Sequence, residues 1–468
     1  MTIANRIANN KGVKLHSLFS LLLISMALLL PWNTYAEAPV NLKLKDAIKY
    51  ALDANQQARI AKLNVENAQY KVDEMWSQAL PTISGNASLT YNPLLQQSAL
   101  PNIFGPNPNP DETILVSFGQ HWNSNLGVSL TQNVFDKSVF VGMKAARTTQ
   151  EFYVLNQQLT EEQIIEGVAR QYYQILVQRQ QIAVLDSNLM NTLKVQQVLQ
   201  GLYDNGLAKK IDLDRIAVNL SNISSQRQQL LNTVALYENE LKFLMGMPIE
   251  TPIIIMDEEV IVPETLMIPD QFPLQIETRT EYNVLQSQKE LLAYQKESFK
   301  SEYYPTLSLS ANYLYQGIGN EVPLFNGQSQ GVNWFSAASV GLNLKVPIVD
   351  GGFTKSKVRQ ADVSIRKLEQ EIDQTTLALE KAHQNAMIQL NNSLITLKSQ
   401  EDNIKLAEEI YFNTQNNYKN GLATLTDLLA AEISWMQSQT NYTTALLNYR
   451  MAEIQILKSK GQLHSLLN

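Results

Sequence analysis

The sequence predicts an elongated, mixed α/β protein in which one unit of helices and strands occurs twice. The segment LYDNGLAKKIDLDRI at 202–216 returns as NYKNGLATLTDLLAA at 417–431. Upstream of each copy lies another matched pair, ALPTISGNASLTYN at 79–92 and YYPTLSLSANYLYQ at 303–316. Similarity that spreads at a fixed spacing over nearly the whole chain predicts an internal twofold repeat.

Residues 1–36 have the pattern of a signal peptide. Arg6, Lys11 and Lys14 precede an apolar run at 18–30, and Ala36 closes a stretch of small residues suited to a signal peptidase. The run is too short to cross a bilayer as a helix, and a Pro-Trp-Asn sequence interrupts it. We therefore expect cleavage after Ala36 and export of the chain.

Composition excludes several classes of function. The chain of 468 residues has no cysteine, 4 histidines and a formal net charge of −7. Disulfides, thiolate metal sites and a cysteine nucleophile are thereby excluded, and a nucleic-acid partner is disfavoured. The sequence has no G-x-S-x-G motif and no metal-ligand spacing of histidines. We expect neither an enzyme nor a protein with a cofactor or metal.

Two long helical hairpins are the clearest pattern in the sequence. Residues 355–419 contain neither Pro nor Gly, and apolar or small residues recur there at spacings of three and four. A helix of this length is a rod of about 95 Å. Its counterpart is expected at 139–203. A Gly-Leu turn follows each rod, and second helices are expected at 212–245 and 427–459, so that both turns lie at one end.

Two pairs of strands, one pair in each repeat, are predicted by alternation of apolar and polar residues. The segments are 83–91, 125–131, 307–315 and 339–346. A soluble sheet packed on a core would show the same alternation. Strands of about ten residues, with aromatic side chains near their ends and polar loops between them, favour contact with lipid. We expect the loops at 92–122 and 316–335 to lie at the cell surface.

Four strands cannot close a barrel by themselves. An open strand edge in a bilayer leaves unpaired backbone amides, each of which costs several kcal/mol. Two copies would supply eight strands, whose interior side chains fill, whereas three copies supply twelve and leave a lumen. The sequence therefore predicts a trimeric, twelve-stranded β-barrel with four strands per chain.

These features resemble the TolC-like outer-membrane efflux proteins. The resemblance is carried by the repeat, by VPIVDGG at 346–352 and by the pattern YxxGxxxxxDLL at 418–429. It implies a homotrimer in the outer membrane of a Gram-negative bacterium, in contact with outer-membrane lipid. The barrel would be continuous with a long periplasmic α-helical coiled-coil barrel. The resemblance also implies an exit duct for a periplasmic adaptor and an inner-membrane pump of the RND or ABC type.

The expected organisation follows from the repeat. The first repeat is assigned to 37–246 and the second to 273–463, with hairpin tips near 203–212 and 418–427. A proline-rich connector at 247–272 is expected to form an irregular belt, and 464–468 is a tail. The alternative to a duct for efflux or type I secretion is an elongated coiled-coil structural or adhesive protein of the cell surface. The cargo stays open between drugs, metal ions and proteins.

The resemblance also implies a gate at the hairpin tips. Asp427, Asp212 and Tyr418 match gate positions of the family, whereas Ala423 and Ala430 stand where the family has a gate arginine and a second aspartate. Residues of the other hairpin are hypothesised to substitute: Asp214, Lys209, Lys210 and Arg215.

A structural role for the same tip residues is also expected. Thr424 and Asp427 have the spacing of a capping box. Gly206 and Gly421 are expected to end their helices with positive φ. The adjoining Leu207 and Leu422 would then be presented to the helical hairpin of the adaptor.

Overall fold

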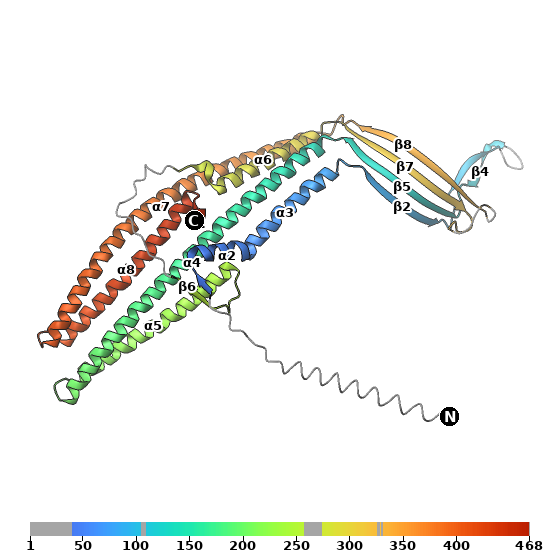
Figure 1. Ribbon diagram of the computed structural model, residues 1–468. Coiled ribbons are helices and arrows are strands. Elements are labelled where there is room, and N and C mark those ends of the chain that lie inside the picture. Colours follow the sequence, from blue (N-terminus) through green and yellow to red (C-terminus); the bar gives the residue numbers. More distant parts are fainter. Residues whose placement is uncertain (1–39, 104–108, 257–273, 325–327, 329–330, 468) are drawn as a thin grey trace, which may run out of the picture.

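The computed structural model describes residues 40–103, 109–256, 274–324, 328 and 331–467. The predicted signal peptide at 1–36 and positions 257–272 of the predicted connector lie outside the described residues. Figure 1 shows an elongated molecule with strands at one end and the turns of two helical hairpins at the other.

The twofold repeat is visible in the order of the elements. The first repeat contains α2 (Leu44–Ala54), α3 (Gln56–Ser77), β2 (Thr82–Tyr91), β5 (Trp122–Phe135), α4 (Lys137–Asp204) and α5 (Lys210–Met245). The second contains the 3-10 turn η2 (Ile276–Thr278), α6 (Thr280–Ser301), β7 (Thr306–Gly319), β8 (Val332–Lys345), α7 (Phe353–Lys419) and α8 (Leu425–Ser459), followed by η4 (Leu463–Leu467). The predicted fold of long helices and paired strands in two repeats is confirmed.

The four long strands form one antiparallel sheet in the order β2-β5-β7-β8. Its register aligns apolar residues across all four strands, as in the row Ile83, Leu130, Ala311 and Val340. Adjacent rows are polar; in one of them the hydroxyls of Ser84 and Ser129 lie 2.7 Å apart. The alternation in the sequence therefore produces one apolar and one polar face.

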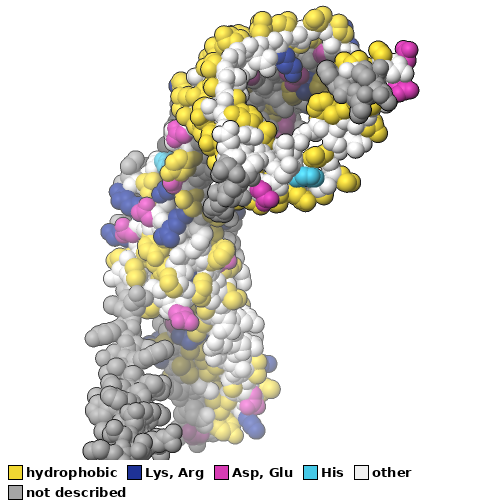
Figure 2. Space-filling model, turned by 90° about the vertical axis from the view of Figure 1, so that its right-hand side faces the viewer, with side chains coloured by type: hydrophobic (Ala, Val, Ile, Leu, Met, Phe, Trp, Pro, Cys, Tyr) yellow, Lys and Arg dark blue, Asp and Glu magenta, His cyan; other side chains and the backbone are white. Residues whose placement is uncertain are grey.

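The apolar face has no cover within the described residues. Val340 is 77% exposed, and Leu342 and Leu344 beside it on β8 are exposed as well. In Figure 2, which looks at the strand end, hydrophobic side chains gather around the outside of the curved strand region, and a hollow lies inside it. Aromatic pairs stand at the far strand ends, with Tyr91 and Trp122 centred 4.7 Å apart.

The predicted surface loop at 92–122 is partly wrong, because it contains a hairpin of two further strands. β3 (Gln97–Asn102) pairs with β4 (Asn109–Ser117). Cross-strand pairs such as Leu100 with Ile114 supply the apolar contact that stabilises such a hairpin. The strands β7 and β8 also extend into the second predicted loop, at 316–335, and leave only its centre as a connection.

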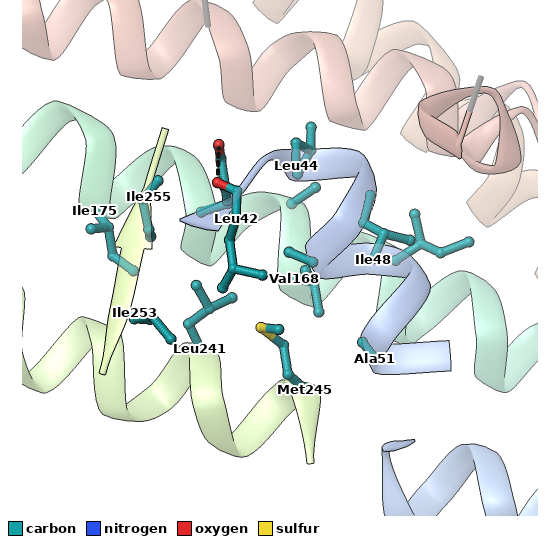
Figure 3. Close-up of a cluster of buried hydrophobic side chains, with 14 of the residues drawn as sticks. Leu42, Leu44, Ile48, Ala51, Val168, Ile175, Leu241, Met245, Ile253 and Ile255 are labelled. Carbon is teal, nitrogen blue, oxygen red and sulfur yellow. Dashed lines mark hydrogen bonds between the residues drawn. The ribbon is translucent and has the colours of Figure 1, made fainter. Parts of the chain in front are cut away.

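The described part of the connector is more regular than predicted. β6 (Ile253–Ile255) pairs in parallel with β1 (Val40–Leu42). The Tyr172 hydroxyl joins the two strands, since it lies 3.1 Å from the carbonyl oxygen of Leu42 and 2.7 Å from that of Met256. Figure 3 shows the apolar cluster that this strand pair completes with α2, α4 and α5.

All four hairpin helices end in the same way. The turns after α4, α5, α7 and α8 each have a glycine with φ between 69° and 75°, namely Gly206, Gly246, Gly421 and Gly461. In each, the glycine N–H and the next N–H bond back to carbonyls of the last helical turn, which is the Schellman motif. The expected positive φ of Gly206 and Gly421 is confirmed.

No helix in the described part of the chain is both long enough and apolar enough to cross a membrane.

Candidate gate and docking site at the hairpin tips

The two turns expose a leucine each. In the α4–α5 turn the N–H of Leu207 bonds the carbonyl of Leu202 at 2.8 Å, and in the α7–α8 turn the N–H of Leu422 bonds the carbonyl of Asn417 at the same distance. These bonds fix the backbone of both turns, yet Leu207 is 75% and Leu422 78% exposed. Rigid turns therefore present two apolar side chains to the surroundings.

The tips of the two hairpins pack against each other within one chain. Leu199 of α4, Ile216 of α5 and Leu425 of α8 are buried together, and Tyr418 of α7 packs against them. The pKa of Tyr418 is raised, chiefly by this burial and then by the negative charge of Asp212. The structure thus brings Tyr418 and Asp212, two residues predicted for the gate, to one place.

Asp427 forms the capping box that the sequence predicted. Its carboxylate accepts from the N–H of Thr424 at 2.9 Å, and its own N–H donates to the Thr424 hydroxyl at 3.2 Å. Hydrogen bonds from the Thr424 hydroxyl and N–H lower the pKa of Asp427. The carboxylate is exposed, so the cap leaves it open to further partners.

Arg215 links the hairpins near their tips. Its Nη1 donates to the hydroxyl of Thr426 at 3.0 Å, from α5 to α8. Of the residues hypothesised to replace the missing gate arginine, Arg215 reaches the second hairpin, while Lys209 and Lys210 are exposed. Asp214 is exposed and lines a groove of about 470 Å³ between α5 and α8.

A second groove, between α4 and α7, was not predicted. It has a volume of about 290 Å³ and combines aromatic with cationic side chains, among them Tyr411, Phe412, Tyr418, Lys194 and Lys419. Its two walls come from different repeats. Sequence patterns within one helix hold no signal of which residues two distant helices place opposite each other.

Long helical hairpins joined to a sheet with an uncovered apolar face define a class of elongated outer-membrane proteins. The chain matches the family model described as "Outer membrane efflux protein" over residues 47–247 and 281–462, and it belongs to that family. The two matched ranges correspond to the two repeats. Members of the family are channels and not enzymes.

Curated relatives share modest identity with the chain. The outer membrane protein TolC of Salmonella enteritidis is 20% identical over 436 residues, which cover 88% of this chain and 80% of that protein. The match to TolC of Vibrio cholerae is 24% identical over 163 residues, or 35% of this chain and 36% of that protein. The protein CyaE of Bordetella pertussis is 23% identical over 159 residues, which cover 34% of this chain and 32% of that protein. The chain thus spans about a third of the length of two of these relatives.

Solved structures share the fold. The outer membrane protein VceC of Vibrio cholerae superposes with a TM-score of 0.69 at 16% identity, covering 89% of this chain and 96% of that one. The CmeC outer membrane channel of Campylobacter jejuni gives a TM-score of 0.68 at 15% identity, and the superposition covers 90% of this chain and 85% of that one. For the open state of the MtrE channel of Neisseria gonorrhoeae the TM-score is 0.65 at 16% identity, and the superposition covers 90% of this chain and 89% of that one.

Proposed function

We propose that three copies of this chain form the exit duct of a tripartite efflux or type I secretion system. The duct conducts substrates passively through a twelve-stranded barrel in the outer membrane and a helical tunnel in the periplasm. Membership in the outer membrane efflux protein family favours this function over a surface adhesin. Family members form homotrimers within tripartite efflux systems.

The observation that carries the proposal is the open sheet. β2 and β8 are its two edges, and within the described residues neither has a strand on its outer side. Unpaired edges beside an exposed apolar face are unstable in a bilayer unless another strand pairs with them. Pairing β8 of one copy with β2 of the next satisfies both edges, and three copies close the ring with a lumen.

The gate is assigned to the tips. Three chains would place six carboxylates, from Asp212 and Asp427, around the periplasmic entrance, with Tyr418 packed beside Asp212. A ring of carboxylates attracts cations and accepts hydrogen bonds that hold the helix ends together. Asp214 and Arg215 add one charge of each sign per chain. The Arg215–Thr426 contact supports a role for the first hairpin in closure.

The adaptor is expected to bind the same end. Leu207 and Leu422, held by Gly206 and Gly421, offer apolar contacts on rigid turns. The groove between α4 and α7 adds aromatic side chains and two lysines, which suit a helix with apolar and acidic residues. The pump of the RND or ABC type would connect through this adaptor.

Single-channel recording tests the gate. The purified protein is inserted into planar bilayers, and the double variant Asp212→Ala, Asp427→Ala is compared with the control Asp402→Ala, an exposed aspartate further up α7. We expect larger conductance and weaker cation preference for the double variant only. Unchanged conductance would remove both aspartates from the gate, and absence of any current from the wild type would contradict the duct itself.

A further inference from the structure

The two hairpins of one chain meet along a seam of α4 and α8 that combines apolar and polar contacts. Leu199 of α4 packs with Leu425 of α8 near the tips, and Ile454 of α8 joins the apolar cluster of α4 further up. Inside the second hairpin, α7 and α8 share two apolar clusters. Between the hairpins, α4 faces α8 through polar pairs: Lys458 with Glu166 at 2.8 Å, Gln181 with Thr443 at 3.3 Å, and Thr192 with Glu432 at 2.5 Å. Polar contacts of this kind hold less tightly than buried apolar surface. The polar levels of the seam, such as Thr192 with Glu432, are therefore its parts best suited to open and close.

Glu432 is the most deeply buried carboxyl group of this seam. Glu432 is 4% exposed, and Thr192, which lies opposite it on α4, is fully buried. Trp435 and Tyr411 stack beside it, with ring centroids 4.8 Å apart and nearly parallel planes. Among the described residues, no lysine, arginine or histidine forms an ion pair with Glu432. A buried carboxylate without a cation is strongly destabilised.

The hydrogen bonds around Thr192 identify the protonation state that satisfies the site. The Thr192 hydroxyl oxygen lies 2.9 Å from the carbonyl oxygen of Asn188 and 2.5 Å from Oε1 of Glu432. A hydroxyl has one hydrogen, and a carbonyl oxygen only accepts. With an ionised Glu432, the Thr192 hydroxyl donates to Oε1 and its contact with the Asn188 carbonyl oxygen is not a second hydrogen bond. Both contacts are full hydrogen bonds when Thr192 donates to the Asn188 carbonyl and the neutral carboxyl group of Glu432 donates to Thr192.

Electrostatics favour the same state. Burial raises the pKa of Glu432 above its ordinary value, against the smaller opposite effect of the Thr192 hydrogen bond. Burial, followed by the charge of Glu432, raises the pKa of Tyr411 to about 12, so Tyr411 stays neutral. Lys194 and Lys419 line the adjoining groove together with Tyr411.

The seam also holds unpaired polar groups at this level. The side-chain amide of Asn188 is buried, and within the described residues neither its oxygen nor its nitrogen has a hydrogen-bond partner. Unsatisfied buried groups cost about 1–3 kcal/mol each. They make the closed seam less stable than an apolar contact and favour a reversible one.

We propose that Glu432 is a proton-binding site that joins the two hairpins. With its proton, Glu432 donates to Thr192 and the seam closes. When the proton leaves to solvent, Glu432 becomes an anion without a cation beside it. Burial of this charge destabilises the closed seam, and the hairpins separate at this level. Glu432 lies about two turns into α8 from the tip, so a separation here moves the tips as well. The effect on conduction rests on the proposed function, whereas the protonation itself does not.

Infrared spectroscopy of the purified full chain tests the protonation. We expect the difference spectrum between wild type and Glu432→Gln at about pH 5.5 to contain the carbonyl band of a neutral carboxylic acid, which an exposed glutamate has largely lost at that pH. Raising the pH should abolish the band. The exposed Glu408→Gln on α7 is the control and should show only carboxylate bands. Carboxylate bands alone for Glu432 would overturn the proposal.

Pulsed measurements of the distance between spin labels on the two tips test whether the protonation of Glu432 moves the tips. The chain has no cysteine, so Leu207→Cys and Leu422→Cys give unique labels, and labelled chains are diluted with unlabelled ones. We expect the distance within a chain to lengthen as the pH rises in the wild type and in Glu408→Gln, and to keep its low-pH value in Glu432→Gln. If Glu432→Gln fails to fold, Thr192→Val should lengthen the distance at low pH. A wild-type pH response in Glu432→Gln, or an unchanged distance in Thr192→Val, would refute the link.

Discussion

Gly246 and Gly461 end α5 and α8 with the same backbone angle, φ 69°, and each faces the junction just before the helix that leads to the strands of its own repeat. Gly246 lies against Ala54 and Asn55, between α2 and α3, and Gly461 lies against Thr278 and Arg279, between η2 and α6. The duplication thus extends to the packing that joins the hairpins to the rest of the molecule. The two sites differ in how closely the backbones approach.

Alanine at these two glycines should destabilise the protein to different degrees. A Cβ on Gly461 would lie 3.4 Å from the carbonyl oxygen of Thr278, so Gly461→Ala costs mainly the positive φ, about 1–2 kcal/mol. On Gly246 it would lie 2.6 Å from the carbonyl oxygen of Ala54, which forces the backbone to move. We expect a clearly lower thermal midpoint for Gly246→Ala. Equal midpoints would contradict this packing.

Removal of the Asp427 carboxylate should fray the start of α8. Asp427→Ala loses the bonds to the Thr424 N–H and hydroxyl. Because the pKa of Asp427 is lowered in the folded protein, its contribution to stability is present above its ordinary pKa and is lost as the pH falls through the folded value. Hydrogen exchange of the first turn of α8 should accelerate in the variant. Unchanged exchange there, with Asp402→Ala as reference, would show that the cap is dispensable.

The start of α7 should lose stability in acid. Asp350 accepts from the N–H groups of Gly352 at 2.9 Å and Thr354 at 2.8 Å, and hydrogen bonds from Thr354 and Gly352 lower its pKa to about 2. This stabilisation is complete above the ordinary value of 3.8 and disappears as the pH falls through about 2. Hydrogen exchange near residue 354, followed against pH, should rise in that window. Asp350→Ala should show the fast rate at every pH.

The contact between Arg215 and Thr426 should favour the closed tip. Arg215→Met keeps much of the side chain's apolar stem but removes the donor, and Thr426→Val removes the acceptor with little change in shape. Because both variants break one hydrogen bond, we expect each to increase the open time in bilayer recordings and the double variant to add little. Fully additive effects would indicate that the two residues act separately.

Much of the fold was predictable because it rests on regular patterns. Apolar spacings of three and four placed the long rods at 139–203 and 355–419, within two residues of the observed bounds at each end. Alternation of apolar and polar residues predicted the four long strands. Their register places apolar residues opposite apolar ones, such as Leu130 opposite Ala311. The capping box of Thr424 with Asp427 was predictable from spacing alone.

Other features depend on contacts between distant segments. β1 and β6 are three-residue strands that only pair because Tyr172 and the surrounding helices hold them together. Glu432 shares its helix face with Leu428 and Trp435, and the Thr192 hydroxyl that it contacts lies on α4, far away in the sequence. Tyr418 and Asp212 come from different repeats, so no pattern within one repeat predicts that the charge of Asp212 acts on Tyr418.

We propose that each chain supplies four strands of a barrel that it cannot close alone. Native mass spectrometry of the full-length protein, released from detergent micelles, measures the number of chains in the complex directly. We expect three chains per complex. A single chain that stays folded in the micelle would contradict it.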